Sequence, residues 1–131
     1  MNSVPDAAQL RADLAALPVL DRKVVGGLTI LLISEPSNVR NREWLAERFV
    51  QLAVVAHGFG EASSSDAAVA TIESYAKERM GELVGRSLAV FVRVAEDLKQ
   101  GPAGPPYGLD AAFAQVKDYV GDVDLEPPVE G

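Results

Sequence analysis

VVGGLTILLI, residues 24–33, decides whether the fold contains a strand, because this apolar run fits two periodicities. Its large side chains follow a helical pattern at positions 24, 25, 28, 31 and 32. Its β-branched content also fits a strand, and each of its two glycines costs a helix about 1 kcal/mol. A single strand would find no partner elsewhere in the chain. We therefore expect a buried helix in an all-α fold, with an α+β fold containing one strand near residues 28–33 as the alternative.

Upstream of this run, the sequence predicts a short amphipathic helix over residues 6–17. Asp6 follows a proline and complements the helix dipole, and leucines recur at i, i+4 and i+7 on one face. Pro18 is expected to end this helix. Asp21 is expected to cap the next helix, which carries the apolar run.

Downstream of the run, residues 34–38 form a break before a third helix. Ser37 and Asn38 are its candidate N-caps. An apolar stripe with helical spacing follows, with charged residues on the other faces. His57 and Gly58 are typical of a helix end, because histidine complements the dipole and glycine accepts a left-handed conformation. This capping role explains His57 better than a role as a general base does.

A fourth helical pattern covers residues 66–100, which is long for a globular helix. Gly81 and Gly85 lie in its middle, so we expect either a kink there or the meeting of two helices. Their spacing also lets another backbone come close. The two glycines are therefore candidate contact residues for a neighbouring helix of the same chain or of another subunit.

Residues 101–108 are rich in Gly and Pro and cannot continue a helix. We expect this linker to separate a helical bundle domain over residues 1–100 from residues 109–131, which comprise a short amphipathic helix and an extended acidic C-terminal tail. The segment from 101 onward holds one Lys and six acids, a net charge of -5, whereas residues 1–100 hold eleven basic and thirteen acidic residues, a net charge of -2.

The short helix after the linker has an apolar face with helical spacing. Phe113, Val116 and Val120 form this face. A short amphipathic segment on a tether is typical of a docking arm, so these residues are candidate anchors on a partner. The alternative, which we weigh equally, is that they fold back as the last helix of the same bundle.

A second candidate binding patch lies near the start of the third helix, where Arg40 and Arg42 neighbour Trp44. Arginines at a helix N-terminus oppose the dipole, so an anionic partner would explain their presence. The simpler interpretation is a pair of ordinary surface arginines beside a half-buried tryptophan.

The sequence offers few residues for catalysis or metal binding, since the 131 residues include one histidine and no cysteine. His57 has no acidic residue or histidine at the spacing of a metal motif, and Gly26-Gly27 lacks the residues that complete a phosphate loop. We expect these two glycines to permit close helix packing. We therefore expect no metal site, no cofactor and no catalytic residue, which favours a non-enzyme without deciding the question.

Composition narrows the class of protein further. A hydrophobic content of 48% predicts one globular domain, and a net charge of -7 disfavours a nucleic-acid partner. The longest apolar run is about half the length of a membrane-spanning helix, and the first residues lack a signal-peptide pattern. We accordingly expect a cytoplasmic protein that does not enter a membrane, and the high Ala, Val, Gly and Arg content suggests a bacterial source.

Together these patterns predict a compact bundle of four to six helices with an extended acidic tail. The favoured function is that of a non-enzymatic interaction or assembly protein, a helical adaptor or subunit that self-associates or docks on a larger protein partner. The alternative is a small-molecule-binding helical protein or minor enzyme with an interior pocket.

Overall fold

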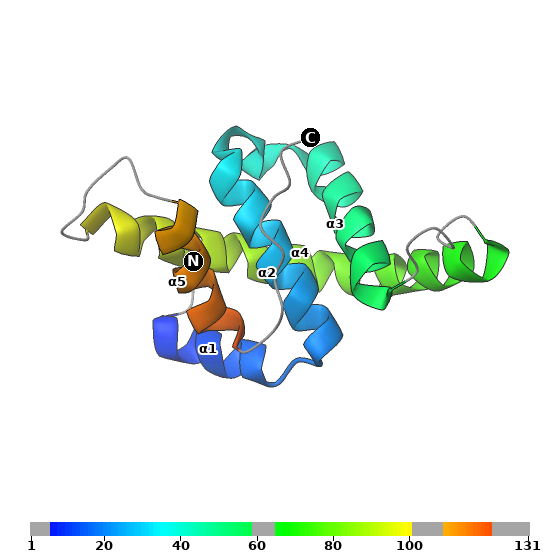
Figure 1. Cartoon of the computed structure of the whole chain (residues 1–131), viewed down its shortest axis with the longest axis horizontal. Coiled ribbons are helices and arrows are strands. Elements are labelled where there is room, and N and C mark those ends of the chain that lie inside the picture. The colour runs from blue at the N-terminus through cyan, green and yellow to red at the C-terminus, as the bar shows by residue number, and fades with distance from the viewer. Residues whose placement is uncertain (1–5, 59–64, 101–108, 122–131) are drawn as a thin grey trace.

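Five α-helices and one 3₁₀-helix make up the computed structural model, which describes residues 6–58, 65–100 and 109–121 (Figure 1). In chain order they are α1 (Ala7–Ala15), α2 (Val19–Ser34), the 3₁₀-helix η1 (Pro36–Arg40), α3 (Arg42–His57), α4 (Asp66–Gln100) and α5 (Leu109–Val120). The described residues contain no strand, so the predicted all-α bundle is confirmed and the alternative strand near residues 28–33 is wrong. The predicted linker and acidic tail lie outside the described residues.

Helix α2 is the central element, because it packs against α3, α4 and α5. Val24 and Val25 are fully buried, and a helix that is covered on several sides needs apolar residues at nearly every position. This burial explains why the run at 24–33 fits both periodicities. A Cβ atom at Gly27 would lie 2.6 Å from Cδ2 of Leu52 in α3, so the predicted role of this glycine in close helix packing is confirmed. None of the helices within the described ranges combines the length and the hydropathy needed to cross a membrane.

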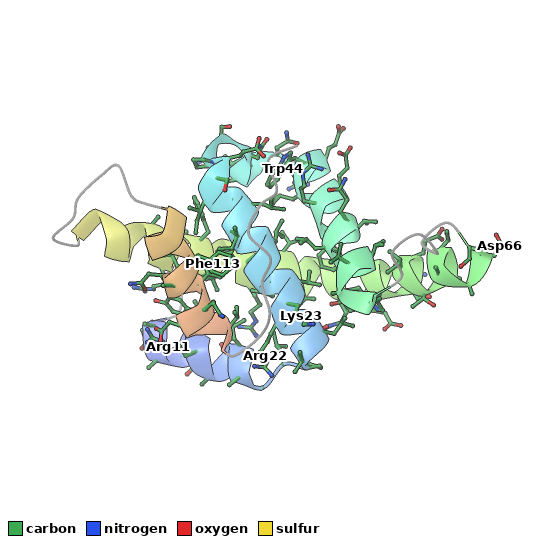
Figure 2. The ribbon with its side chains drawn as sticks, in the orientation of Figure 1. Arg11, Arg22, Lys23, Trp44, Asp66 and Phe113 are labelled. Atoms are coloured by element: carbon green, nitrogen blue, oxygen red, sulfur yellow. The ribbon has the colours of Figure 1, made fainter. Side chains whose placement is uncertain are left out.

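Helix α5 packs back on α1, α2 and α4, and its apolar face joins the main core (Figures 1 and 2). Val116 and Val120 are 0% and 1% exposed, and Phe113 is half-buried against the same core. The Arg22 guanidinium of α2 donates a hydrogen bond to the Val120 carbonyl oxygen at 3.2 Å, which ties the end of α5 to the start of α2. The interpretation of these three apolar residues as anchors on a partner is therefore corrected, because they fill the core of their own chain.

The predicted capping chemistry holds at α1 and fails at α2. Asp6 caps α1, since its Oδ1 accepts a hydrogen bond from the backbone N–H of Gln9 at 2.8 Å. Helix α2 begins at Val19, directly after Pro18, and no side chain caps it. Asp21 therefore lies inside the first turn, where it is 5% exposed and its carboxylate contacts α4 instead of backbone amides.

Helix α3 begins later than predicted because η1 precedes it. Ser37 and Asn38 lie within η1, and Asn41 caps α3 instead of either of them. Oδ1 of Asn41 accepts a hydrogen bond from the backbone N–H of Trp44 at 3.1 Å. At the other end, Gly58 adopts the predicted left-handed conformation, with φ of 76°.

Replacing Asn41 by alanine is expected to lower the free energy of unfolding by about 1 kcal/mol, because the first turn of α3 loses its side-chain acceptor. Asn41→Ser keeps an acceptor and should lose less. Asn38→Ala removes only an exposed 3.3 Å contact between two side-chain amides and should be nearly neutral. Urea unfolding followed by circular dichroism measures all three, and a larger loss at Asn38 than at Asn41 would contradict this assignment of the cap.

Helix α4 runs without interruption from Asp66 to Gln100, so the predicted meeting of two helices near Gly85 is wrong. Gly81 and Gly85 are exposed on this helix. A Cβ atom at either position would meet no atom within 4 Å beyond the adjacent residues and the backbone of its own helix. No helix in the described part of the chain therefore uses their close-approach spacing, and contact with another subunit stays a prediction.

Candidate functional site

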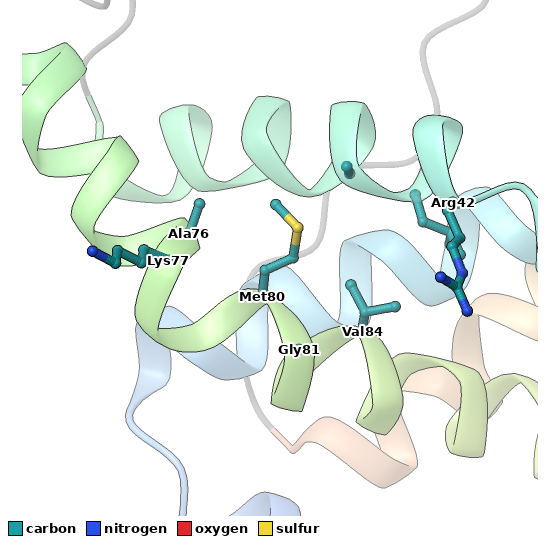
Figure 3. A pocket seen from close by; sticks show the side chains of 8 residues that line it. Arg42, Ala76, Lys77, Met80, Gly81 and Val84 are labelled. Carbon is teal, nitrogen blue, oxygen red and sulfur yellow. The ribbon is translucent and has the colours of Figure 1, made fainter.

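Helices α3 and α4 border an open groove with a volume of about 340 Å³ (Figure 3). Its floor is almost entirely aliphatic and comes from both helices. The apolar lining residues are Leu45, Ala46, Ala76, Met80, Gly81 and Val84. We refer to this feature as the α3–α4 groove.

The spacing of residues on α4 explains why the groove exists. Ala76, Met80 and Val84 recur every four residues, so they lie along one face of α4, toward α3. Ala46 and Gly81 carry little or no side chain, and they leave space that larger residues would fill. Methionine adds an unbranched, polarisable side chain that adapts to the shape of a neighbour.

Two cations flank this aliphatic floor, Arg42 from α3 and Lys77 from α4 (Figure 3). Both side chains are exposed, and within the described ranges neither makes an ion pair or a hydrogen bond. The chain as a whole carries a net charge of -7. The two ends of the groove are therefore local positive sites on an acidic protein, which suits an apolar ligand with negative charge at its ends.

The structure brings together only some of the residues that the sequence singles out. Arg42 and Gly81 both line the α3–α4 groove, although 39 positions separate them. Arg40 is exposed at the end of η1, and Gly85 lies one turn beyond Gly81 on α4, outside the groove lining. The predicted patch near the start of α3 is thus divided, with Arg42 in the groove and Arg40 outside it.

Trp44 is the half-buried tryptophan of the simpler interpretation, in which the patch is a pair of surface arginines beside it. It is half-buried and packs against the apolar cluster that contains Leu28 and Leu32. The Arg48 guanidinium lies 5.5 Å from the centre of its ring, within range of a cation–π interaction. Trp44 therefore attaches the start of α3 to α2 and does not line the α3–α4 groove.

The sequence analysis missed a buried ionic cluster between α2 and α4. The Asp21 carboxylate accepts a hydrogen bond from the Tyr75 hydroxyl at 2.8 Å and forms an ion pair with Arg79 at 2.9 Å. Arg79 also pairs with Glu82 at 3.1 Å. Burial, followed by the hydrogen bond to Asp21, raises the pKa of Tyr75, so the hydroxyl stays protonated and remains a donor. No local spacing predicts this cluster, because 58 positions separate Asp21 from Arg79.

His57 lies at the end of α3 as predicted. Its Nδ1 donates to the Ala53 carbonyl oxygen at 2.7 Å, and its ring meets Tyr75 edge-on with 4.9 Å between ring centres. These contacts hold the ring against its own helix and against α4, as a structural role requires. Across the described ranges, no group of three or more His, Asp or Glu residues is placed to hold a metal ion.

Comparisons of the chain with protein-family models, with curated proteins and with solved structures found no match. The α3–α4 groove, with an aliphatic floor and a cation at each end, is therefore the feature of this chain on which a functional inference rests.

Proposed function

We propose that this protein is a non-enzymatic interaction module and that the α3–α4 groove is its docking surface. The observation that supports this function is an open aliphatic groove whose two ends carry the cations Arg42 and Lys77. The lining includes no carboxylate, imidazole or hydroxyl group, and its one amine, Lys77, is exposed and has no such group among the lining residues to activate it as a base or nucleophile. Such a surface binds a partner segment without transforming it.

The dimensions of the groove favour a segment of a protein partner. Along α4 it extends from Ala76 to Val84, which corresponds to about 12 Å at 1.5 Å per helical residue. This length holds about two turns of a helix or four residues of an extended chain. The expected occupant presents two or three apolar side chains to the floor and carboxylates to Arg42 and Lys77.

A small-molecule site is the weaker candidate. The volume of about 340 Å³ falls at the lower end of the range for ligand pockets. Ligand pockets also enclose most of the surface of their ligand, whereas this groove is open to solvent along α4. A helical adaptor or assembly subunit, which binds a segment of another protein, fits this shape better.

Selection from a random peptide library tests the proposed function without knowledge of the partner. We expect the full chain to enrich peptides in which apolar residues are flanked by Asp or Glu. Their affinity is then measured by fluorescence anisotropy against a variant that fills the groove, Gly81→Gln. This change should weaken binding at least tenfold, about 1.4 kcal/mol.

The matched control is Gly85→Gln, the same change one turn further along α4. Both glycines have open space around a new Cβ atom, and both variants gain helix propensity, so neither is expected to lose stability. Only Gly81 lines the groove. Failure to enrich any peptide, or equal binding by the wild type and the Gly81 variant, would overturn the proposed function.

A further inference from the structure

We infer that the occupant of the α3–α4 groove is residues 122–131 of a second copy of this chain. The inference rests on the proposed function and commits the docking surface to one partner. The exchanged segment has the sequence DVDLEPPVEG. Two copies that exchange this segment reciprocally would form a closed, two-fold symmetric dimer.

The chemistry of the segment complements the chemistry of the groove. Its ten residues include four acids and no Lys or Arg, whereas the groove carries a cation at each end. Its three aliphatic side chains match the aliphatic floor. These are Val123, Leu125 and Val129. The segment thus has both features that the groove selects for, apolar contact and negative charge.

The length of this stretch also fits the groove. Asp122 and Glu126 are four positions apart, which spans about 13 Å in an extended chain. On the groove, Lys77 lies seven residues from Val84, about 10 Å along α4, and Val84 is the α4 residue beside Arg42 in Figure 3. In an extended chain Val123 and Leu125 share one face, which would contact the floor, while the acids that alternate with them would lie at the rim, beside the long Arg42 and Lys77 side chains.

The position of α5 favours a second copy over the same chain. The segment follows α5, whose last residue, Val120, is held against α2 by Arg22. In Figure 1, α2 and α5 lie in front of α4, which runs from right to left. In Figure 3, α4 runs from left to right, with α2 and α5 behind it and the groove toward the viewer. The groove therefore opens on the face away from α5, where a neighbouring copy presents its segment without wrapping it around α4.

The test is a complementation experiment on the full chain, read as mass by light scattering after size-exclusion chromatography. A groove variant, Arg42→Glu/Lys77→Glu, reverses both cations, and a segment variant, Val123→Ser/Leu125→Ser, removes two apolar side chains. The wild type is expected to show twice the chain mass of 13.9 kDa, and each variant alone should be a monomer. A mixture of the two variants should restore the dimer mass, because one brings an intact segment and the other an intact groove.

A charge-matched control separates the groove from general repulsion. Arg40→Glu/Lys117→Glu makes the same charge change at two exposed positions outside the groove, and this variant should remain a dimer. Circular dichroism of every variant checks that the fold is kept.

Three outcomes would overturn the inference. A wild type that stays monomeric over a concentration series excludes a second copy as the occupant. A wild-type dimer that both groove and segment variants leave intact places the interface elsewhere. A mixture of the two variants that fails to associate shows that the segment of one copy does not enter the groove of another. If library peptides still bind the groove while the wild type is monomeric, the proposed function stands and only this inference fails.

Discussion

Val116→Asp is expected to lower the free energy of unfolding by at least 3 kcal/mol, the largest effect of any single change considered for this chain. Val116 is fully buried in the core that α5 shares with α1, α2 and α4. A carboxylate placed there would be buried among aliphatic side chains without a partner. Because small domains are stable by only about 5–15 kcal/mol, this is a large fraction of the total. Urea unfolding followed by circular dichroism measures the loss.

The matched control is Ala114→Asp, which adds the same charge two residues earlier, on the exposed face of α5. Its effect should stay below about 1 kcal/mol, as is usual for surface changes and helix propensity. If both variants are equally mild, α5 does not belong to the core, and the interpretation of this helix as a docking arm returns.

The sequence could not show whether α5 docks on a partner or packs in its own bundle, for a physical reason. The apolar spacing from Phe113 to Val120 predicts an amphipathic helix, and that prediction is confirmed. The spacing is the same whether the apolar face meets its own core or that of a partner. What decides is long-range packing: α5 lies on α1, α2 and α4, and Arg22 adds a hydrogen bond to the carbonyl oxygen of Val120 across 98 positions of sequence.

The conflicting periodicities of residues 24–33 have a similar origin. A surface helix has an apolar face and a polar face, but α2 packs on three neighbouring helices and is apolar on most sides. When the polar face is missing, the sequence pattern of a helix is nearly the same as that of a buried strand. The helix was the correct choice here because the chain has no second candidate strand. Gly27 weakens a helix in isolation, and its close approach to Leu52 explains why a glycine occupies this position.

Helix starts were predicted less well than helices, because several residues of similar capping ability follow one another. Ser37, Asn38 and Asn41 all favour an N-cap, and local preference does not choose among them. The choice depends on η1, which takes up the chain from Pro36 to Arg40 and moves the start of α3 to Arg42.

The α3–α4 groove was only partly predictable. Arg42 stood out because a cation at a helix start opposes the dipole, and Gly81 because of its spacing to Gly85. Neither signal shows that the two residues line the same groove. That depends on how α3 packs on α4, which is a tertiary property. Arg40 entered the prediction through proximity in sequence alone, and the structure separates it from the groove.

Arg79→Met is expected to lower the free energy of unfolding by about 3 kcal/mol, the second largest effect. Asp21 is 5% exposed, and without Arg79 its carboxylate keeps only the hydrogen bond from the Tyr75 hydroxyl. Removal of one partner of a buried ion pair typically costs about 3–5 kcal/mol. The lower value applies here because the Arg79 side chain is 27% exposed, so part of its interaction is already screened by water. Urea unfolding at neutral pH measures the change.

The double variant Asp21→Leu/Arg79→Met shows whether the loss arises from a stranded charge. Replacement of both partners by apolar residues leaves no unpaired carboxylate, so the double variant should be more stable than Arg79→Met alone. Glu82→Ala is the control, since its exposed pair with Arg79 should contribute less than about 1 kcal/mol. If Arg79→Met is no worse than Glu82→Ala, or if the second substitution deepens the loss, the Asp21 carboxylate is adequately solvated without Arg79. In that case, the contact of α2 with α4 is stabilised mainly by the aliphatic residues around the ionic cluster.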